Sequence, residues 1–328
     1  MTDQIEIDQY FLGREVKKRK KELHFIYKMN KSIFTDDFPL VSSDEELQKI
    51  IKIFPEYDSY YIASGCIKDR KKIFDNLWQI FQPLADKHFL SDCKKHFHQR
   101  MWEMYLGVAL IKNGLDISSS KSGPDFIVNK GRENEIFIEA TACTRGATED
   151  AVPEEYFAET PEEIKVQDVP YDKMLIRITN SLDSKYKKYK DHVEREKKSY
   201  IVAVNRGALG YMDANIPLIF KSLFGLGFQS YKVINGKLFN EGWKRKKVLI
   251  KESGAEIPIS FFEEKEHSIV SAVIYSDISI LNPPKVIGSD CILVHNHMAK
   301  DPVDQKIFVF FKQYIAKYDK ELVSINQI

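Results

Sequence analysis

The stretch HFHQRMWEMYLGVALIKN at residues 96–113, with GPDFIV at 123–128 and IFIEAT at 136–141, decides the fold of this chain. Apolar residues recur in 96–113 at the three- and four-residue spacing of an α-helix and cover most of its surface, so we expect a largely buried helix. The two shorter runs flank a polar turn and predict a β-hairpin. The expected order is therefore helix, strand, strand.

Three carboxylates interrupt these apolar segments: Glu103 in the helix, Asp125 before the first strand and Glu139 within the second. A carboxylate in a buried element is costly unless a positive group meets it. Asp125 beside Glu139 would add only negative charge. A hard divalent cation resolves this conflict, because it binds carboxylate oxygens, a carbonyl oxygen and water. The sequence therefore predicts a magnesium site at the hairpin.

A long helix and further buried strands follow. Pro170 and Asp172 begin a helical pattern that extends to about Lys197, and the continuous apolar run YIVAV at 200–204 is typical of a strand buried on both faces. Two more apolar runs predict strands that extend the same sheet, and an aromatic segment predicts a last helix. These three segments are 269–275, 291–294 and about 305–319.

The segment before residue 91 has a helical pattern. Ser43-Asp44-Glu45-Glu46 has the form of a capping box and predicts a helix through Ile53, which Pro55 ends. We expect a helical N-terminal region at 1–90 and one α/β domain at 91–328 with a C-terminal sheet extension. A separate domain after residue 206 is the alternative, although its strands have little core of their own.

The order of these elements, with GPD at 123–125 and Glu139-x-Thr141, resembles the core of the PD-(D/E)xK nuclease superfamily, also called restriction endonuclease-like. The resemblance implies an α/β core of helix, β-hairpin, strand, helix and strand, with a mixed central sheet flanked by helices. It also implies that Asp125, Glu139 and the carbonyl of Ala140 bind Mg²⁺ or Mn²⁺, and that Glu103 completes the site. The segments RMWEMYL, SGPDF and FIEAT look like an uncharacterised bacterial branch of that superfamily.

One position departs from the family pattern. The lysine of the motif would fall at Thr141, and threonine cannot supply a positive charge. Lys185 is the best replacement, because it lies on an otherwise apolar stripe of the helix expected at 172–197. Lys185-x-x-x-Tyr189 also resembles the Gln-x-x-x-Tyr element that several nuclease families carry on this helix. Lys121, four residues before Asp125, is the second candidate.

Two functions remain open at this point. The first is a metal-dependent endonuclease that hydrolyses DNA, in which Glu103, Asp125, Glu139 and Lys185 are catalytic. The second is a nuclease fold that no longer cuts and serves as a nucleic-acid-binding or scaffolding module, and Thr141 is its main support. RNA as the substrate stays open, because the sequence contains no recognisable base-reading module.

Candidate nucleic-acid contacts cluster on and near the helix expected at 172–197. Its segment KYKKYK at 185–190 interleaves lysine with tyrosine, which suits a phosphate backbone and stacked bases, although a long exposed helix has the same composition. We expect Arg177, Lys188, Tyr189 and Lys121 to contact nucleic acid.

Composition sets limits on partners and compartment. Forty-nine basic residues against forty-eight acidic ones leave a net charge of +1, so attraction to nucleic acid must come from local patches. The four cysteines show no zinc-ligand spacing. No apolar run approaches the length of a membrane span, and no signal pattern is visible. We expect a cytoplasmic protein without a membrane partner, and a homodimer stays open.

Overall fold

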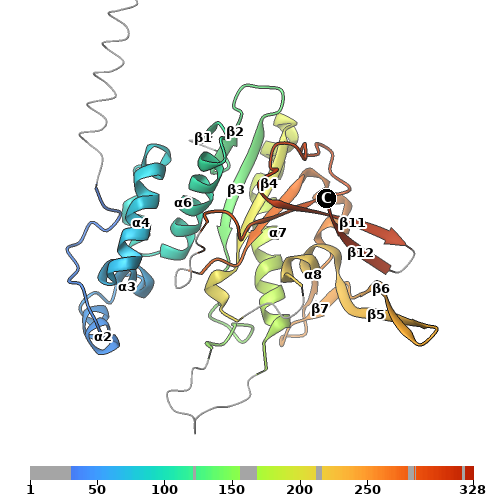
Figure 1. Cartoon of the computed structure of the whole chain (residues 1–328), viewed down its shortest axis with the longest axis horizontal. Coiled ribbons are helices and arrows are strands. Elements are labelled where there is room, and N and C mark those ends of the chain that lie inside the picture. Colours follow the sequence, from blue (N-terminus) through green and yellow to red (C-terminus); the bar gives the residue numbers. More distant parts are fainter. Residues whose placement is uncertain are drawn as a thin grey trace, which may run out of the picture.

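A mixed ten-stranded sheet forms the centre of the protein (Figure 1). The computed structural model describes residues 31–120, 123–155, 168–211, 216–279, 284, 286–319 and 322–328. Within these residues the strand order is β1-β2-β3-β4-β9-β10-β11-β12-β6-β5. The strands in this order are β1 (Ile117–Ser119), β2 (Phe126–Val128), β3 (Ile136–Ala142), β4 (Ser199–Asn205), β9 (Ala272–Ser276), β10 (Ile292–His295), β11 (Lys312–Asp319), β12 (Leu322–Gln327), β6 (Lys237–Arg245) and β5 (Leu226–Ile234). Two further strands, β7 (Val248–Ile250) and β8 (Glu256–Pro258), form a separate small sheet.

Helices cover both faces of the large sheet. On one face lie α6 and, beside it, the N-terminal helices; α7 and α8 cover the other (Figure 1). These helices are α2 (Asp44–Ile53), α3 (Ser59–Cys66), α4 (Lys68–Phe81), α5 (Phe89–Cys93), α6 (Phe97–Lys112), α7 (Tyr171–Glu196) and α8 (Leu218–Phe224). Within the described residues, no helix combines the length and apolar character needed to cross a membrane.

The sheet combines a hairpin with parallel strands around the expected site. β1, β2 and β3 are antiparallel, whereas β3 is parallel to β4 and β4 is parallel to β9. Helix α7 makes the connection from β3 to β4, as parallel neighbours require. The protein is therefore a mixed α/β fold with a large central sheet and flanking helices.

Side chains alternate along the strands and therefore pack into two hydrophobic cores, one on each face of the sheet. In β4, Ile201 and Ala203 contact the core under α6, while Val202 and Val204 contact the core under α7. This explains why 200–204 has no polar alternation and confirms the prediction of a strand buried on both faces. The first core also includes α4, through residues such as Phe74 and Phe81, so the apolar packing is continuous across residue 90.

Several predicted elements are confirmed. Helix α6 occupies 97–112 and α7 occupies 171–196, close to the ranges that periodicity indicates. The Ser43 hydroxyl accepts a hydrogen bond from the Glu46 amide at 3.3 Å, so the predicted N-cap of α2 is present. Strands β9 and β10 overlap the two apolar runs predicted to extend the sheet, and each ends one residue beyond its run.

The predicted last helix is wrong. Residues 312–319 form β11, which pairs in parallel with β10 and in antiparallel with β12. Phe308 and Phe311 are buried, and they lie in the turn before the strand. Without β11, one edge of β10 would be buried with unpaired backbone N–H and C=O groups. The cost of leaving these groups unpaired is larger than the weak helical preference of the aromatic segment.

Candidate active site

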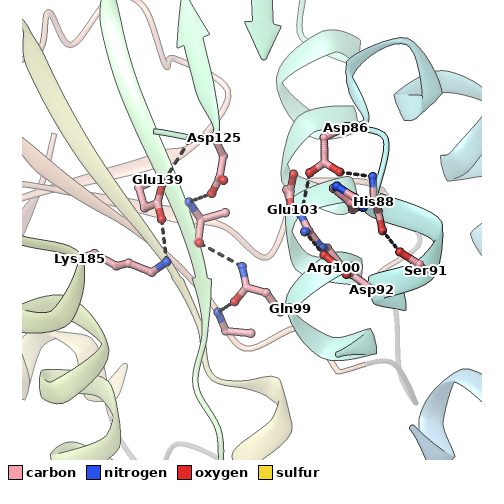
Figure 2. A network of polar contacts seen from close by, with 12 residues as sticks. Asp86, His88, Ser91, Asp92, Gln99, Arg100, Glu103, Asp125, Glu139 and Lys185 are labelled. Atoms are coloured by element: carbon pink, nitrogen blue, oxygen red, sulfur yellow. Dashed lines mark hydrogen bonds and ion pairs between the residues drawn. The ribbon is translucent and has the colours of Figure 1, made fainter. Parts of the chain in front are cut away.

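The site begins with a mismatch in strand length. β2 pairs with β3 only from Ile136 to Ile138, so the last four residues of β3 have no neighbouring strand on that side. Side chains take over this free edge (Figure 2). Asp125, directly before β2, accepts a hydrogen bond from the Ala140 amide at 2.8 Å. Gln99 of α6 accepts one from the Ala142 amide at 2.8 Å and donates to the Ala140 carbonyl at 3.1 Å.

Glu139 is the most deeply buried carboxylate of the site, with an exposed fraction of 1%. Its Oε1 atom lies 2.6 Å from the Lys185 ammonium and 3.5 Å from the Lys188 ammonium, both on α7. Its Oε2 atom accepts a hydrogen bond from the Asp125 amide at 3.3 Å. The Glu139 carboxylate is thus bonded to the Asp125 backbone on one side and to a lysine of α7 on the other (Figure 2).

The ionised form of Asp125 is disfavoured in this arrangement. Burial raises the pKa of Asp125 to about 8, and the negative charges of Glu139 and Glu103 act in the same direction, against the Ala140 amide and Lys185. Without a metal, the carboxyl group is therefore mostly protonated at neutral pH. A divalent cation would relieve the same repulsion, and its binding would release this proton.

Glu103 belongs to a neighbouring ion-pair network. Arg100 Nη1 lies 2.7 Å from its Oε2 atom, and the same guanidinium contacts Asp92 and Asp86 (Figure 2). Burial raises the pKa of Glu103, while the Arg100 charge lowers it. Glu103 is therefore held by arginine, although its charge still acts on Asp125.

One cavity of about 660 Å³ unites these groups. Glu103, Asp125, Glu139, Lys185 and Lys188 all line it. Its volume lies within the range typical of small-ligand sites, and its wall presents carboxylates beside ammonium groups. Such a wall suits an anionic substrate that arrives together with a cation.

The remaining predicted residues have different positions. Tyr189 donates a hydrogen bond to the Gly123 carbonyl at 3.2 Å and so fixes the turn before Asp125. Arg177 donates to the carbonyl and hydroxyl of Thr144, at 2.8 and 3.0 Å, and does not line the cavity. Lys121 lies outside the described residues.

Sequence reasoning missed Gln99 and Arg100. Gln99 lies one helical turn before Glu103 and therefore on the same face of α6, so its spacing was a usable signal. The pairing of Arg100 with Glu103, three residues apart, follows the same rule. Asp92 and Asp86, by contrast, reach Arg100 only through the tertiary arrangement.

The donor set fits a hard cation with a partly hydrated shell. Among the described residues, no group of three or more His, Cys, Asp or Glu side chains is arranged to hold a metal ion. Two carboxylates, Asp125 and Glu139, together with the Ala140 carbonyl would be the protein ligands of such a cation. Mg²⁺ commonly uses one or two carboxylates and fills its other positions with water and substrate phosphate.

Comparisons with protein-family models, with curated proteins and with solved structures find no match for this chain.

Proposed function

We propose that the protein is a Mg²⁺- or Mn²⁺-dependent nuclease of the PD-(D/E)xK type that hydrolyses phosphodiester bonds of DNA in the cavity at Asp125 and Glu139. The order α6, antiparallel β1 and β2, β3, α7 and β4 supports the proposal, because the resemblance implies a core of helix, hairpin, strand, helix and strand. The observation that carries the proposal is that the Glu139 carboxylate bonds both the Asp125 amide and the Lys185 ammonium, while the Asp125 carboxylate holds the Ala140 amide on the same strand.

Each residue would have a separate role. Asp125, Glu139 and the Ala140 carbonyl would hold the cation, which would lower the pKa of a bound water and neutralise phosphate charge. Lys185 would stabilise the negative charge that develops on the phosphate. It would do so instead of the motif lysine, whose position is occupied by Thr141. Gln99 would orient the Ala140 carbonyl, because its side chain donates to that oxygen and accepts from the Ala142 amide.

A nuclease fold without activity is the second candidate, and two observations favour it. Thr141 stands where the family has its lysine, and the buried Glu103 is neutralised by Arg100 instead of a metal. Such a protein would bind DNA without taking up Mg²⁺. Isothermal titration with Mg²⁺ beside a DNA gel shift separates the two functions.

The decisive experiment is plasmid cleavage with Mg²⁺ or Mn²⁺ and with EDTA as the blank. We expect cleavage by the wild type and none by Asp125→Ala or Glu139→Ala. Glu133→Ala is the matched control, because Glu133 is an exposed carboxylate in the turn of the same hairpin. Robust cleavage by both site variants would show that Asp125 and Glu139 do not hold the catalytic metal.

A further inference from the structure

The hairpin of β5 and β6 projects from the far edge of the sheet. The two strands are antiparallel, with register shifts between Leu226 and Gln229 and between Ser230 and Tyr231. Asn235 and Gly236, with φ of 51° and 74°, form the two-residue turn between them. β6 pairs with β12 at only two positions, Leu322 with Lys244 and Val323 with Trp243. The rest of the hairpin therefore extends beyond the sheet, at the lower right of Figure 1.

Apolar side chains on this hairpin face solvent. The exposed fractions are 85% for Phe228, 71% for Leu238, 65% for Val233 and 54% for Tyr231. Ile234 and Phe239 are exposed as well. Scattered exposed apolar residues are ordinary, but a projecting element that carries six of them indicates a contact surface. The edge position of β5 adds a row of unpaired backbone groups.

The hairpin and the residues directly after it are positively charged. Residues 226–245 contain four lysine and arginine residues and one glutamate, a net charge of +3, and residues 246–251 add three lysines, whereas the whole chain carries +1. Arg245 contacts Glu263 and Lys246 contacts Asp172. In the described part of the chain, the other five lysines form no ion pair; they are Lys232, Lys237, Lys244, Lys247 and Lys251.

We propose that the β5–β6 hairpin is an arm that binds duplex DNA. The major groove admits a two-stranded β-ribbon, and strands of nine residues span about 30 Å. Lysines along the ribbon meet phosphates, while exposed apolar side chains contact thymine methyl groups or base steps. A protein partner would have to offer a complementary acidic surface, whereas DNA supplies negative charge along its whole length.

This arm lies far from the carboxylate cavity. Seven strand spacings separate β3 from β5, which corresponds to roughly 30 Å along the sheet. That length is close to one turn of B-DNA. The arm therefore makes a second contact with DNA, and its binding does not depend on whether the cavity cuts.

The test measures binding of a fluorescent 30-bp duplex, in EDTA so that metal-dependent cleavage is blocked. Lys232→Glu/Lys237→Glu changes two exposed lysines of the arm, and Lys68→Glu/Lys72→Glu makes the same charge change on α4. We expect at least a tenfold loss of affinity for the arm variant alone. The slope of log K against log salt should also decrease by about 2, as for two lost phosphate contacts.

A second variant examines the apolar part of the surface. Phe228→Ser/Leu238→Ser keeps the charge of the arm, so we expect weaker binding with an unchanged salt slope. Thermal melting of all variants checks that they fold. Equal affinity of the two lysine variants would overturn the proposal. A wild-type dimer that Phe228→Ser/Leu238→Ser dissociates, with DNA affinity unaffected, would assign the surface to contact between copies of the chain.

Failure of the arm and failure of the cavity are distinguishable in these experiments. The arm variant Lys232→Glu/Lys237→Glu should lose affinity for the duplex in EDTA whether or not the wild type cleaves plasmid. Loss of cleavage by Asp125→Ala would support the cavity and would say nothing against the arm. Conversely, a wild type that binds through the arm but never cleaves would refute only the nuclease.

Discussion

Replacement of Asp125 by asparagine should stabilise the metal-free protein at pH 8. The pKa of Asp125 rises from 3.8 to about 8 in the folded chain. A raised pKa means that the folded state holds the proton more tightly than the unfolded state does. The associated stability is fully present below about pH 4 and is lost as the pH rises toward 8. Asparagine is neutral throughout and does not incur this loss.

The magnitude follows from the size of the shift. A rise from 3.8 to about 8 is about four units, which corresponds to at most about 6 kcal/mol. Water in the cavity screens the charges, so we expect about 2 kcal/mol at pH 8. The asparagine oxygen can still accept the hydrogen bond from the Ala140 amide, so the variant keeps the local backbone geometry.

The assay is thermal unfolding in EDTA between pH 5 and pH 9. The midpoint of Asp125→Asn should exceed that of the wild type by a few degrees at pH 8 and by much less at pH 5. Glu133→Gln, an exposed change in the same hairpin, should show no such trend. If Asp125→Asn destabilises the protein equally at every pH, the carboxylate is favoured in its ionised form and the electrostatic reasoning is refuted.

Four further outcomes follow from the same geometry. Mg²⁺ should raise the unfolding midpoint of the wild type at pH 7 and release close to one proton per bound ion. Calorimetry in buffers of different ionisation enthalpy measures this proton release, and its absence would contradict the prediction. Arg100→Ala should lower the free energy of urea unfolding by about 3 kcal/mol, because it leaves Glu103 buried without its partner. Arg100→Ala/Glu103→Ala should recover part of this loss. A double variant as unstable as the single one would argue against the ion pair. Lys185→Met should lower kcat on plasmid DNA about a hundredfold with little change in KM, whereas a pure KM effect would mean a binding role. Gln99→Leu should weaken Mg²⁺ binding roughly tenfold by calorimetry, and unchanged affinity would separate Gln99 from the metal site.

Local periodicity explains what the sequence predicted of the fold. The apolar residues of 97–112 surround a helix that is buried on nearly all sides, and the run at 200–204 feeds two cores, so both patterns were unambiguous. The segment 305–319 was ambiguous, because its strand is determined by pairing with β10, which lies outside any local window. The β5–β6 hairpin carried a local signal that was overlooked, the Asn235-Gly236 pair between apolar runs.

For the candidate site, the sequence was sufficient to assign Asp125, Glu139 and Lys185 to one site. It was not sufficient to identify the partners of Glu103. The first three lie on elements whose order in the chain fixes their proximity once β3, α7 and β4 form a parallel unit. Arg100, by contrast, has several acidic neighbours, and the choice among them depends on the position of Asp86 and Asp92 outside α6. Such choices among side-chain partners depend on tertiary packing and leave no periodic trace in the sequence.

The position of Lys185 explains how a threonine at residue 141 is compatible with the proposed chemistry. Side chains alternate along β3, so Glu139 and Thr141 point to the same face, the one that α7 covers. A lysine at 141 would place its ammonium on that face. Lys185 approaches the same face from α7 and lies 2.6 Å from Glu139. The charge therefore comes from the covering helix instead of the strand, and Thr141→Lys in a Lys185→Met background should restore cleavage if the two positions are equivalent. A double variant as inactive as Lys185→Met alone would show that the ammonium must come from α7.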